Sequence, residues 1–396
     1  MQYFKLQIKR ILKSKFTWIS LILILSICAY FLRINYIVNN VDSHDLSQAK
    51  SNLIIQQHNI KYFGKALKDS KLGTQEKKQM TGDLKEAKST SKELQTLIGA
   101  LKNNDWKTAY PIMIRQEKRN LASAKKDNLD NALLAMSKRD LRQLEILAKL
   151  QIPKENYASI KGGFFVLQMM ETTIPPLVVL AVVFILVKIY SAGFFERMRL
   201  SNLLPQKKLT LTEFYTGTTI GFSYFLLIFF LIFLLPSIFF GTGNFNYPIT
   251  AMNPQAKEYI FIPMFRLFLP TLFLELLSFA FITAVVLLII QLFKRRLVAL
   301  LLSVFLLVGG MVLPQFVIGV RSFAQYLPMS YFFALQPVEG MFGISNAYTF
   351  SDENQLVTYP QVNFRNGVIV LVIGTIVILL LNCLIAKSTQ KGRKIK

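Results

Sequence analysis

The sequence predicts an all-α, polytopic membrane protein with six transmembrane helices and a helical extracellular domain. Six apolar runs are long enough to cross a bilayer, basic residues gather in alternate loops, and a long helix-patterned stretch separates the first two runs. A crossing needs about 20 mostly apolar residues. We expect four parts: a cytoplasmic amphipathic helix (1–15), a first transmembrane helix (16–37), an extracellular helical domain (38–162), and a five-helix transmembrane domain with a cytoplasmic coupling segment and an outer re-entrant segment (163–396).

The six apolar runs lie at 16–32, 172–190, 217–239, 268–293, 297–320 and 367–386. The third contains GFSYFLLIFFLIFLL, which is too uniformly apolar for the half-exposed helix of a soluble protein. The first run resembles a signal peptide, but no small-x-small cleavage site follows Tyr30, and Ile27 occupies the position where a lipoprotein box needs a small residue. We therefore expect an uncleaved first span.

The distribution of basic residues predicts the orientation. Outside the long insert there are 23 Lys and Arg, and 18 of them lie before the first run, between the second and third, between the fourth and fifth, or after the last. Basic residues of short loops stay in the cytoplasm, whereas long domains are translocated regardless of charge. Both termini are therefore expected inside, with the insert outside.

The segment before the first span has amphipathic character. Phe4, Ile8, Ile11 and Leu12 fall on one helical face, and most of the lysines lie elsewhere. This pattern is typical of a helix in the headgroup region of an anionic leaflet, which makes membrane lipid an expected partner.

The insert has the periodicity of helical hairpins. A heptad seam of Leu46, Leu53, Ile60 and Leu67 predicts a first helix. Two further helices follow from apolar positions at Leu84, Ala87, Ser91, Leu94, Ile98 and Leu101, and at Leu129, Leu133, Met136, Leu141, Leu144 and Ala148. Breaks are expected at 71–74, at 81–83, around Tyr110–Pro111 and at 151–153. A solvated bundle or short coiled coil is the simpler interpretation, and a substrate-binding role stays open.

Charge and residue usage limit the chemistry of the insert. It carries 23 basic and 14 acidic residues. The excess of basic residues either attracts anionic cell-wall polymers or lipid headgroups, or only reflects the amino-acid composition. No interleaved aromatic and basic pattern suggests nucleic acid. The insert has no cysteine, since Cys28 and Cys383 lie in spans, and the chain has only His44 and His58, so neither a disulfide framework nor a metal site is expected.

A segment after the second span carries a family resemblance. The chain reads FFERMRLSNLLPQKKL there, which is similar to the cytoplasmic segment of type-2 ABC exporter permeases. The resemblance implies an amphipathic helix that docks in a groove of an ATPase subunit. The implied ATPase-coupling residues are Glu196, Arg199, Leu200, Leu203, Leu204, Pro205, Lys207 and Lys208. An ordinary positive-inside loop would explain the basic residues, but not the leucines and the proline.

A second resemblance follows the fifth span. The segment YLPMSYFFALQPVEGMFG looks like the outer segment of those permeases, on the positions Leu327, Pro328, Tyr331, Pro337 and Gly340. Its prolines predict short re-entrant or interfacial helices. Glu171 and Glu275 border or lie within apolar runs, near their outer ends. They either line an outer vestibule together with Pro328 and Tyr331, or neutralise Arg33, Arg266 and Arg321.

Together these features predict a permease subunit of an ABC exporter in a bacterial plasma membrane. The chain has no G-x-x-x-x-G-K-[ST], H-E-x-x-H or G-x-S-x-G motif, so no catalytic residues and no bound cofactor are expected, with ATP and Mg on a partner ATPase. The resemblance implies a second permease copy or a homologous permease, and peptide cargo such as antimicrobials, or else a drug or lipid-linked cargo. The alternative is a non-transporting accessory or receptor protein that acts through its extracellular domain.

Overall fold

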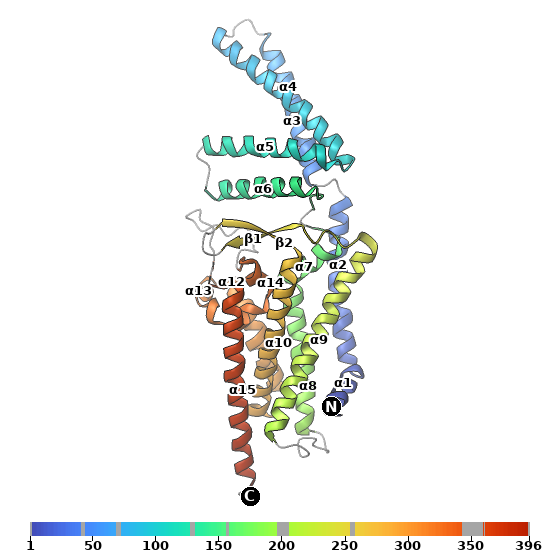
Figure 1. The fold of residues 1–396 in the computed structure, drawn as a ribbon, viewed down its shortest axis with the longest axis vertical. Coiled ribbons are helices and arrows are strands. Elements are labelled where there is room, and N and C mark those ends of the chain that lie inside the picture. The colour runs from blue at the N-terminus through green and yellow to red at the C-terminus, as the bar shows by residue number, and fades with distance from the viewer. Residues whose placement is uncertain are drawn as a thin grey trace. The chain divides into compact units, whose positions relative to one another are not determined.

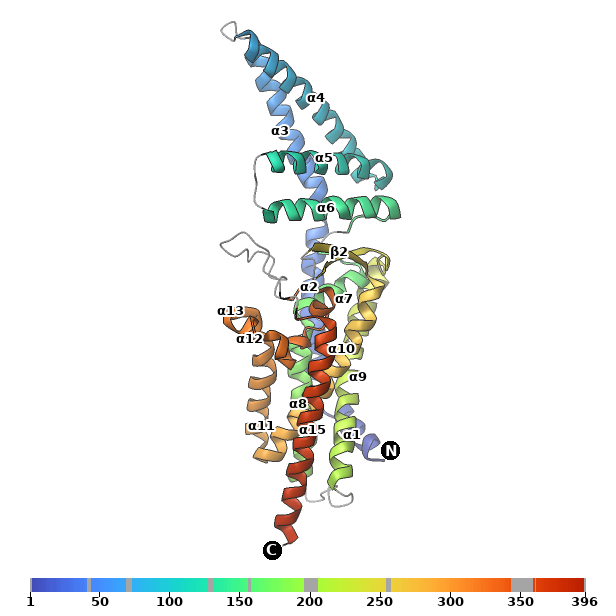
Figure 2. The same ribbon diagram turned by 60° about the vertical axis from the view of Figure 1, so that its left-hand side comes forward.

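The computed structural model describes residues 2–40, 44–68, 73–126, 131–155, 158–195, 206–253, 258–342, 359 and 361–394. The chain divides into two compact units, and each is described by itself. Among the described residues, those before Ile34 and after Ser159 form the first, which we call the membrane unit. Those from Ile34 to Ser159 form the second, which we call the helical unit. Figures 1 and 2 show the elements of each.

The part of the chain that the structure describes contains six helices long and apolar enough to cross a membrane, as predicted. They are Lys15–Asn39, Ile174–Ser191, Lys208–Phe240, Phe265–Phe293, Arg296–Phe316 and Phe364–Lys387. The protein is therefore mostly helical and of the membrane class. The fifth ends before the predicted residue 320, because Val317 takes extended backbone angles and terminates the helix.

The membrane unit is built around α8 (Ile174–Phe195) and α10 (Phe265–Phe293), its most enclosed long helices. Both pack against α9 (Gln206–Phe240), and α15 (Phe364–Lys394) packs along α10, as Figure 1 shows. Gly217 of α9 lies where a Cβ would overlap the Tyr190 hydroxyl and the Thr283 methyl. A small residue lets the three helices approach closely, as is common within membranes.

The amphipathic start forms α1 (Gln2–Leu12), and the long α2 (Lys15–Asn40) follows, with its residues from Ile34 on belonging to the helical unit. The remaining helices of the membrane unit are shorter or interrupted, beginning with α7 (Gly162–Thr172), which precedes α8. The fifth candidate span consists of α11 (Arg296–Ser303), a π-helical turn η2 (Val304–Gly309) and α12 (Gly310–Phe316). Four short elements follow: α13 (Ile318–Arg321), η3 (Ala324–Tyr326), η4 (Pro328–Phe332) and α14 (Leu335–Glu339).

One element departs from the all-α prediction. Strands β1 (Pro248–Asn253) and β2 (Glu258–Pro263) pair antiparallel, with Pro248 opposite Pro263 and Asn253 opposite Glu258. The strands carry β-branched and aromatic residues, and their pairing satisfies backbone groups of a connection between two apolar helices. Sequence reasoning treated this stretch as a short loop, because two six-residue strands give little periodicity.

The helical unit contains two helical hairpins. Helices α3 (His44–Ala66) and α4 (Thr74–Lys102) pack on each other, as do α5 (Trp106–Lys126) and α6 (Asn131–Leu150). The heptad seam is confirmed, because Leu46, Leu53 and Ile60 are buried or half-buried while Ile54 and Ile55 beside them are exposed. Of the α6 positions, Leu144 is buried and Leu129 lies outside the described residues.

Two of the predicted breaks are wrong and two are confirmed. At the break predicted for 71–74, α4 begins at Thr74 after Gly73, which has extended backbone angles. Helix α4 continues through Thr81–Asp83, and Pro111 lies inside α5. The true break falls at Asn103–Asp105, where Asn104 takes a positive φ and Asp105 accepts a hydrogen bond from the Thr108 amide at 3.2 Å. Asn and Asp favour this geometry, so the boundary between α4 and α5 falls at this turn and not at Pro111. Helix α6 ends before Pro153, as expected.

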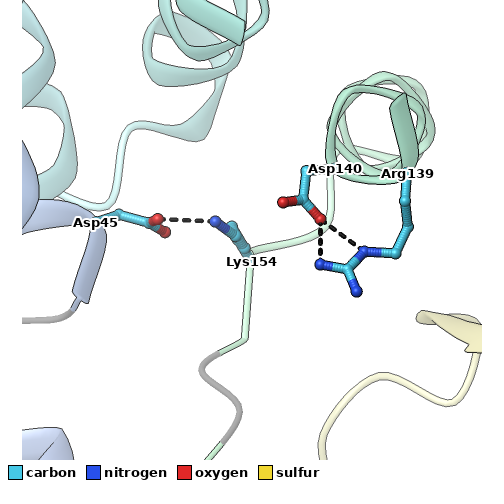
Figure 3. A network of polar contacts seen from close by, with 4 residues as sticks. All are labelled: Asp45, Arg139, Asp140 and Lys154. Carbon is cyan, nitrogen blue, oxygen red and sulfur yellow. Dashed lines mark hydrogen bonds and ion pairs between the residues drawn. The ribbon is translucent and has the colours of Figure 1, made fainter. Parts of the chain in front are cut away.

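Polar contacts tie the ends of the helical unit together. Lys154, after α6, forms an ion pair of 2.7 Å with Asp45 at the start of α3, and Arg139 pairs with the neighbouring Asp140 (Figure 3). The buried Tyr110 hydroxyl donates a hydrogen bond to the Ile152 carbonyl. Residues distant in sequence are thereby joined without a disulfide.

Candidate functional site

The expected ATPase-coupling segment lies mostly outside the described residues. This applies to Glu196, Arg199, Leu200, Leu203, Leu204 and Pro205. Lys207 and Lys208 lie in the first turn of α9, where Lys208 is exposed. The docking of this segment stays a prediction.

The segment after α13 consists of short helices with a buried backbone, in line with the broken, re-entrant character that its prolines predict. Pro328 begins η4, where its missing N–H costs no helical hydrogen bond. Ser330, Phe332 and Ala334 are completely buried. Since η4 packs against α10, α12 and α15, protein surrounds the breaks between these short helices, as a membrane environment requires.

Tyr331 fixes this segment to the long helices. Its hydroxyl donates to the Gln325 carbonyl at 2.8 Å, and its own carbonyl accepts a long hydrogen bond of 3.4 Å from Ser278 of α10. A Cβ at Gly367 of α15 would lie 2.6 Å from the Tyr331 ring. Burial raises the pKa of Tyr331, so the phenol stays neutral and acts as a hydrogen-bond donor.

Gly340 closes the segment. Its φ of +68° caps α14 in the left-handed conformation, and a Cβ there would lie 2.5 Å from the Met252 carbonyl of β1. Gly340, which the family resemblance also names, must therefore be a glycine because it touches the β1–β2 hairpin, an element that the sequence did not predict.

Glu171 is linked to this segment by the side-chain amide of the buried Gln336. Gln336 Nε2 donates to the Glu171 carbonyl at 3.0 Å, and Gln315 Nε2 donates to Gln336 Oε1 at 3.1 Å. Helices α7, α12 and α14 are therefore joined by one chain of hydrogen bonds. We call Glu171, Gln315, Gln336 and Glu339 the polar cluster.

Glu339 was missed by sequence reasoning, which counted only Glu171 and Glu275 as acidic residues near the apolar runs. Its side chain is buried on α14, one turn after Gln336. Burial and then the nearby Glu171 raise the pKa of Glu339, and burial raises the pKa of Glu171. The sequence feature that could have indicated Glu339 is its position three residues after Gln336, which places both side chains on one face of a short helix in an aromatic segment.

Arg321 is buried, and its hydrogen bonds within the described residues go to backbone carbonyls. It donates Nε to the Pro314 carbonyl at 2.9 Å and a second nitrogen to the Gln315 carbonyl, which caps the end of α12. Among the ion pairs of the described residues, none joins Arg33, Arg266 or Arg321 to Glu171 or Glu275. The neutralisation alternative therefore finds no support in that region.

Glu275 has no recorded hydrogen bond to the polar cluster within the described residues. It is buried on α10, one turn before Ser278, and its Oε1 has no hydrogen-bond partner within the described residues. The structure thus brings Pro328 and Tyr331 together on one segment and links Glu171 to that segment, while it records no bond between Glu275 and these residues. A buried carboxyl in a span is costly, so Glu275 stays a candidate for the predicted outer vestibule.

The polar cluster presents carbonyl and carboxyl oxygens of α7 and α14, which can accept hydrogen bonds. The described ranges contain no group of three or more His, Cys, Asp and Glu placed to hold a metal ion. Comparisons of this chain with protein-family models, with curated proteins and with solved structures found no match.

Proposed function

We propose that this chain is a permease subunit of an ABC exporter, driven by a separate ATPase and working beside a second permease. The observation that carries the proposal is the buried segment from Ala324 to Gly340. Three of the five residues there that resemble the permease family, namely Pro328, Tyr331 and Gly340, have a specific contact or backbone role. Six candidate spans and an amphipathic α1 are also consistent with it.

The polar cluster supports a cationic or amphipathic peptide as cargo. Glu171 lies close enough to Glu339 to raise the pKa of Glu339 in addition to burial, and a cationic group would relieve the repulsion between the two carboxyls when they ionise. Aromatic side chains of the same segment would contact the apolar part of such a peptide.

The coupling of this chain to an ATPase is tested by three substitutions in the segment between α8 and α9. Leu200→Asp, Leu203→Asp and Leu204→Asp together should abolish co-purification of an ATP-hydrolysing subunit, because charges would enter an apolar groove. The control is Lys294→Asp with Arg295→Asp, in the loop between α10 and α11. Normal membrane insertion with loss of the ATPase only in the leucine variant supports the proposal.

An accessory protein acting through its helical unit is the second candidate. The compactness of residues 34–159 and their buried seam favour it. Deleting residues 47–156 across a short Gly/Ser linker should leave ATPase binding intact in an exporter. An accessory protein would lose all function, and its soluble helical unit would bind the partner by itself.

A further inference from the structure

A cavity within the membrane unit is lined by none of the residues of the polar cluster. It has a volume of about 600 Å³, within the usual range of small-molecule sites, and lies between α1, α2, α8 and α11. These helices are distant in sequence, and α1 packs against α8. The cavity is therefore a product of the tertiary fold.

The lining of this cavity is cationic. Arg10, Lys13, Lys188 and Arg296 all line it, and no Asp or Glu is among its described lining residues. Lys188 Nζ donates to Ser14 Oγ at 2.6 Å, so it is held in the cavity wall by a neutral partner. Lys13, Lys188 and Arg296 are like charges around one space, and a bound anion would lower their mutual repulsion.

The rest of the wall is apolar. Ile11, Ile185 and Ile189 line the cavity together with Phe16, whose ring stacks on Phe184 at a centroid distance of 5.1 Å. A small hydrophilic anion would leave this surface uncovered. The lining fits a molecule that has both an anionic group and a hydrocarbon chain.

The neighbouring surface of α1 also suits lipid. A second hollow of about 590 Å³ is formed by Phe4, Ile8 and Leu12 with the lysines that flank them, and it shares Lys13 with the first. At the corner between α1 and α2, the half-exposed Trp18 donates its indole N–H to the Leu12 carbonyl at 2.8 Å. Tryptophan and flanking lysines are characteristic of the membrane interface.

We propose that this cavity binds an anionic phospholipid. Its phosphate would pair with Lys13, Lys188 and Arg296, while an acyl chain follows the isoleucines. The lipid would hold α1 against α8 and α11. This inference does not depend on the exporter proposal, because it concerns a different end of the membrane unit.

The test measures lipid retention by the full-length protein purified in neutral detergent. Native mass spectrometry would compare added phosphatidylglycerol with phosphatidylcholine. The variant Lys13→Gln/Lys188→Gln/Arg296→Gln removes three lining cations. Its control, Lys15→Gln/Lys294→Gln/Arg295→Gln, removes the same charge from nearby residues that do not line the cavity.

We expect phosphatidylglycerol to be retained over phosphatidylcholine. If each lost cation lowers the affinity roughly five-fold, the lining variant should bind phosphatidylglycerol about 100-fold more weakly than the original chain. The control variant should bind it with an affinity within about two-fold of the original chain. Should the triple variant fail to fold, Arg296→Gln against Arg295→Gln gives the same comparison. Equal retention of both lipids, equal losses in both variants, or displacement by millimolar inorganic phosphate would overturn the proposal, the last by indicating a soluble anion instead.

Discussion

Replacing Gly340 with alanine tests how the outer segment is fixed to the hairpin. Two costs combine at this position. An L-residue with a φ of +68° costs about 1–2 kcal/mol. The new Cβ would also lie 2.5 Å from the Met252 carbonyl oxygen, and the shift of backbone needed to relieve such an overlap costs a further 1–3 kcal/mol, roughly.

Two other glycines separate these costs. Gly241 has a φ of +85°, and no atom lies within 4 Å of the place that a Cβ would take, so Gly241→Ala meets only the backbone cost of about 1–2 kcal/mol. Gly319 has neither a positive φ nor a neighbour within 4 Å. Gly319→Ala should change stability by less than about 0.5 kcal/mol.

The assay is thermal unfolding of the purified protein in detergent. With about 2–4 °C per kcal/mol, Gly340→Ala should lower the midpoint by roughly 5–15 °C, Gly241→Ala by roughly 2–8 °C, and Gly319→Ala hardly at all. The order of the three is the essential result. If Gly340→Ala unfolds at the same temperature as Gly319→Ala, α14 does not pack closely on β1 and the reasoning fails.

Two further predictions concern charged groups. Burial and Glu171 raise the pKa of Glu339, so its ionisation costs stability in the folded state, a cost absent in acid that grows as the pH rises through the raised pKa. Glu339→Gln should therefore unfold at the same temperature as the original chain in acid and at a higher temperature in alkali. The control, Glu258→Gln at an exposed position, should unfold at the same temperature as the original chain at every pH. If the unfolding temperatures of both variants change with pH in the same way, the buried position of Glu339 does not cause the effect. In the helical unit, a double-mutant cycle on Asp45 and Lys154, with side chains 15% and 28% exposed, should give a coupling of roughly 0.5–1.5 kcal/mol. The more exposed Lys118 and Glu145 should give less than about 0.5 kcal/mol, and equal couplings would contradict the burial argument.

The long apolar runs and the heptad seam were predictable because each is repeated over many residues. A run such as 217–239 has few stable structures besides a membrane helix, and the seam from Leu46 to Leu67 has one apolar face. Helix ends were less predictable. At Pro111 the expected break gave way to the Asn103–Asp105 turn, since local capping outweighed the proline.

The polar cluster could be predicted only in part. Glu171 and Tyr331 stood out as polar groups beside apolar runs. Their link through Gln336, and the burial of Glu339, depend on how α7, α12 and α14 meet, and no pattern within one segment encodes that contact. The cationic cavity similarly combines α1, α2, α8 and α11, so its members have no common spacing in the sequence.

Orientation in the membrane is the claim on which the coupling segment, the polar cluster and the lipid site all depend. The direct measurement is labelling of introduced cysteines in intact cells by a membrane-impermeant maleimide, with Cys28 and Cys383 replaced. Lys92→Cys in α4 and Glu258→Cys in β2, both exposed, should react from outside, whereas the exposed Lys294→Cys should react only after the cells are opened. Outside labelling at position 294, or protection of position 92, would contradict the six-span account.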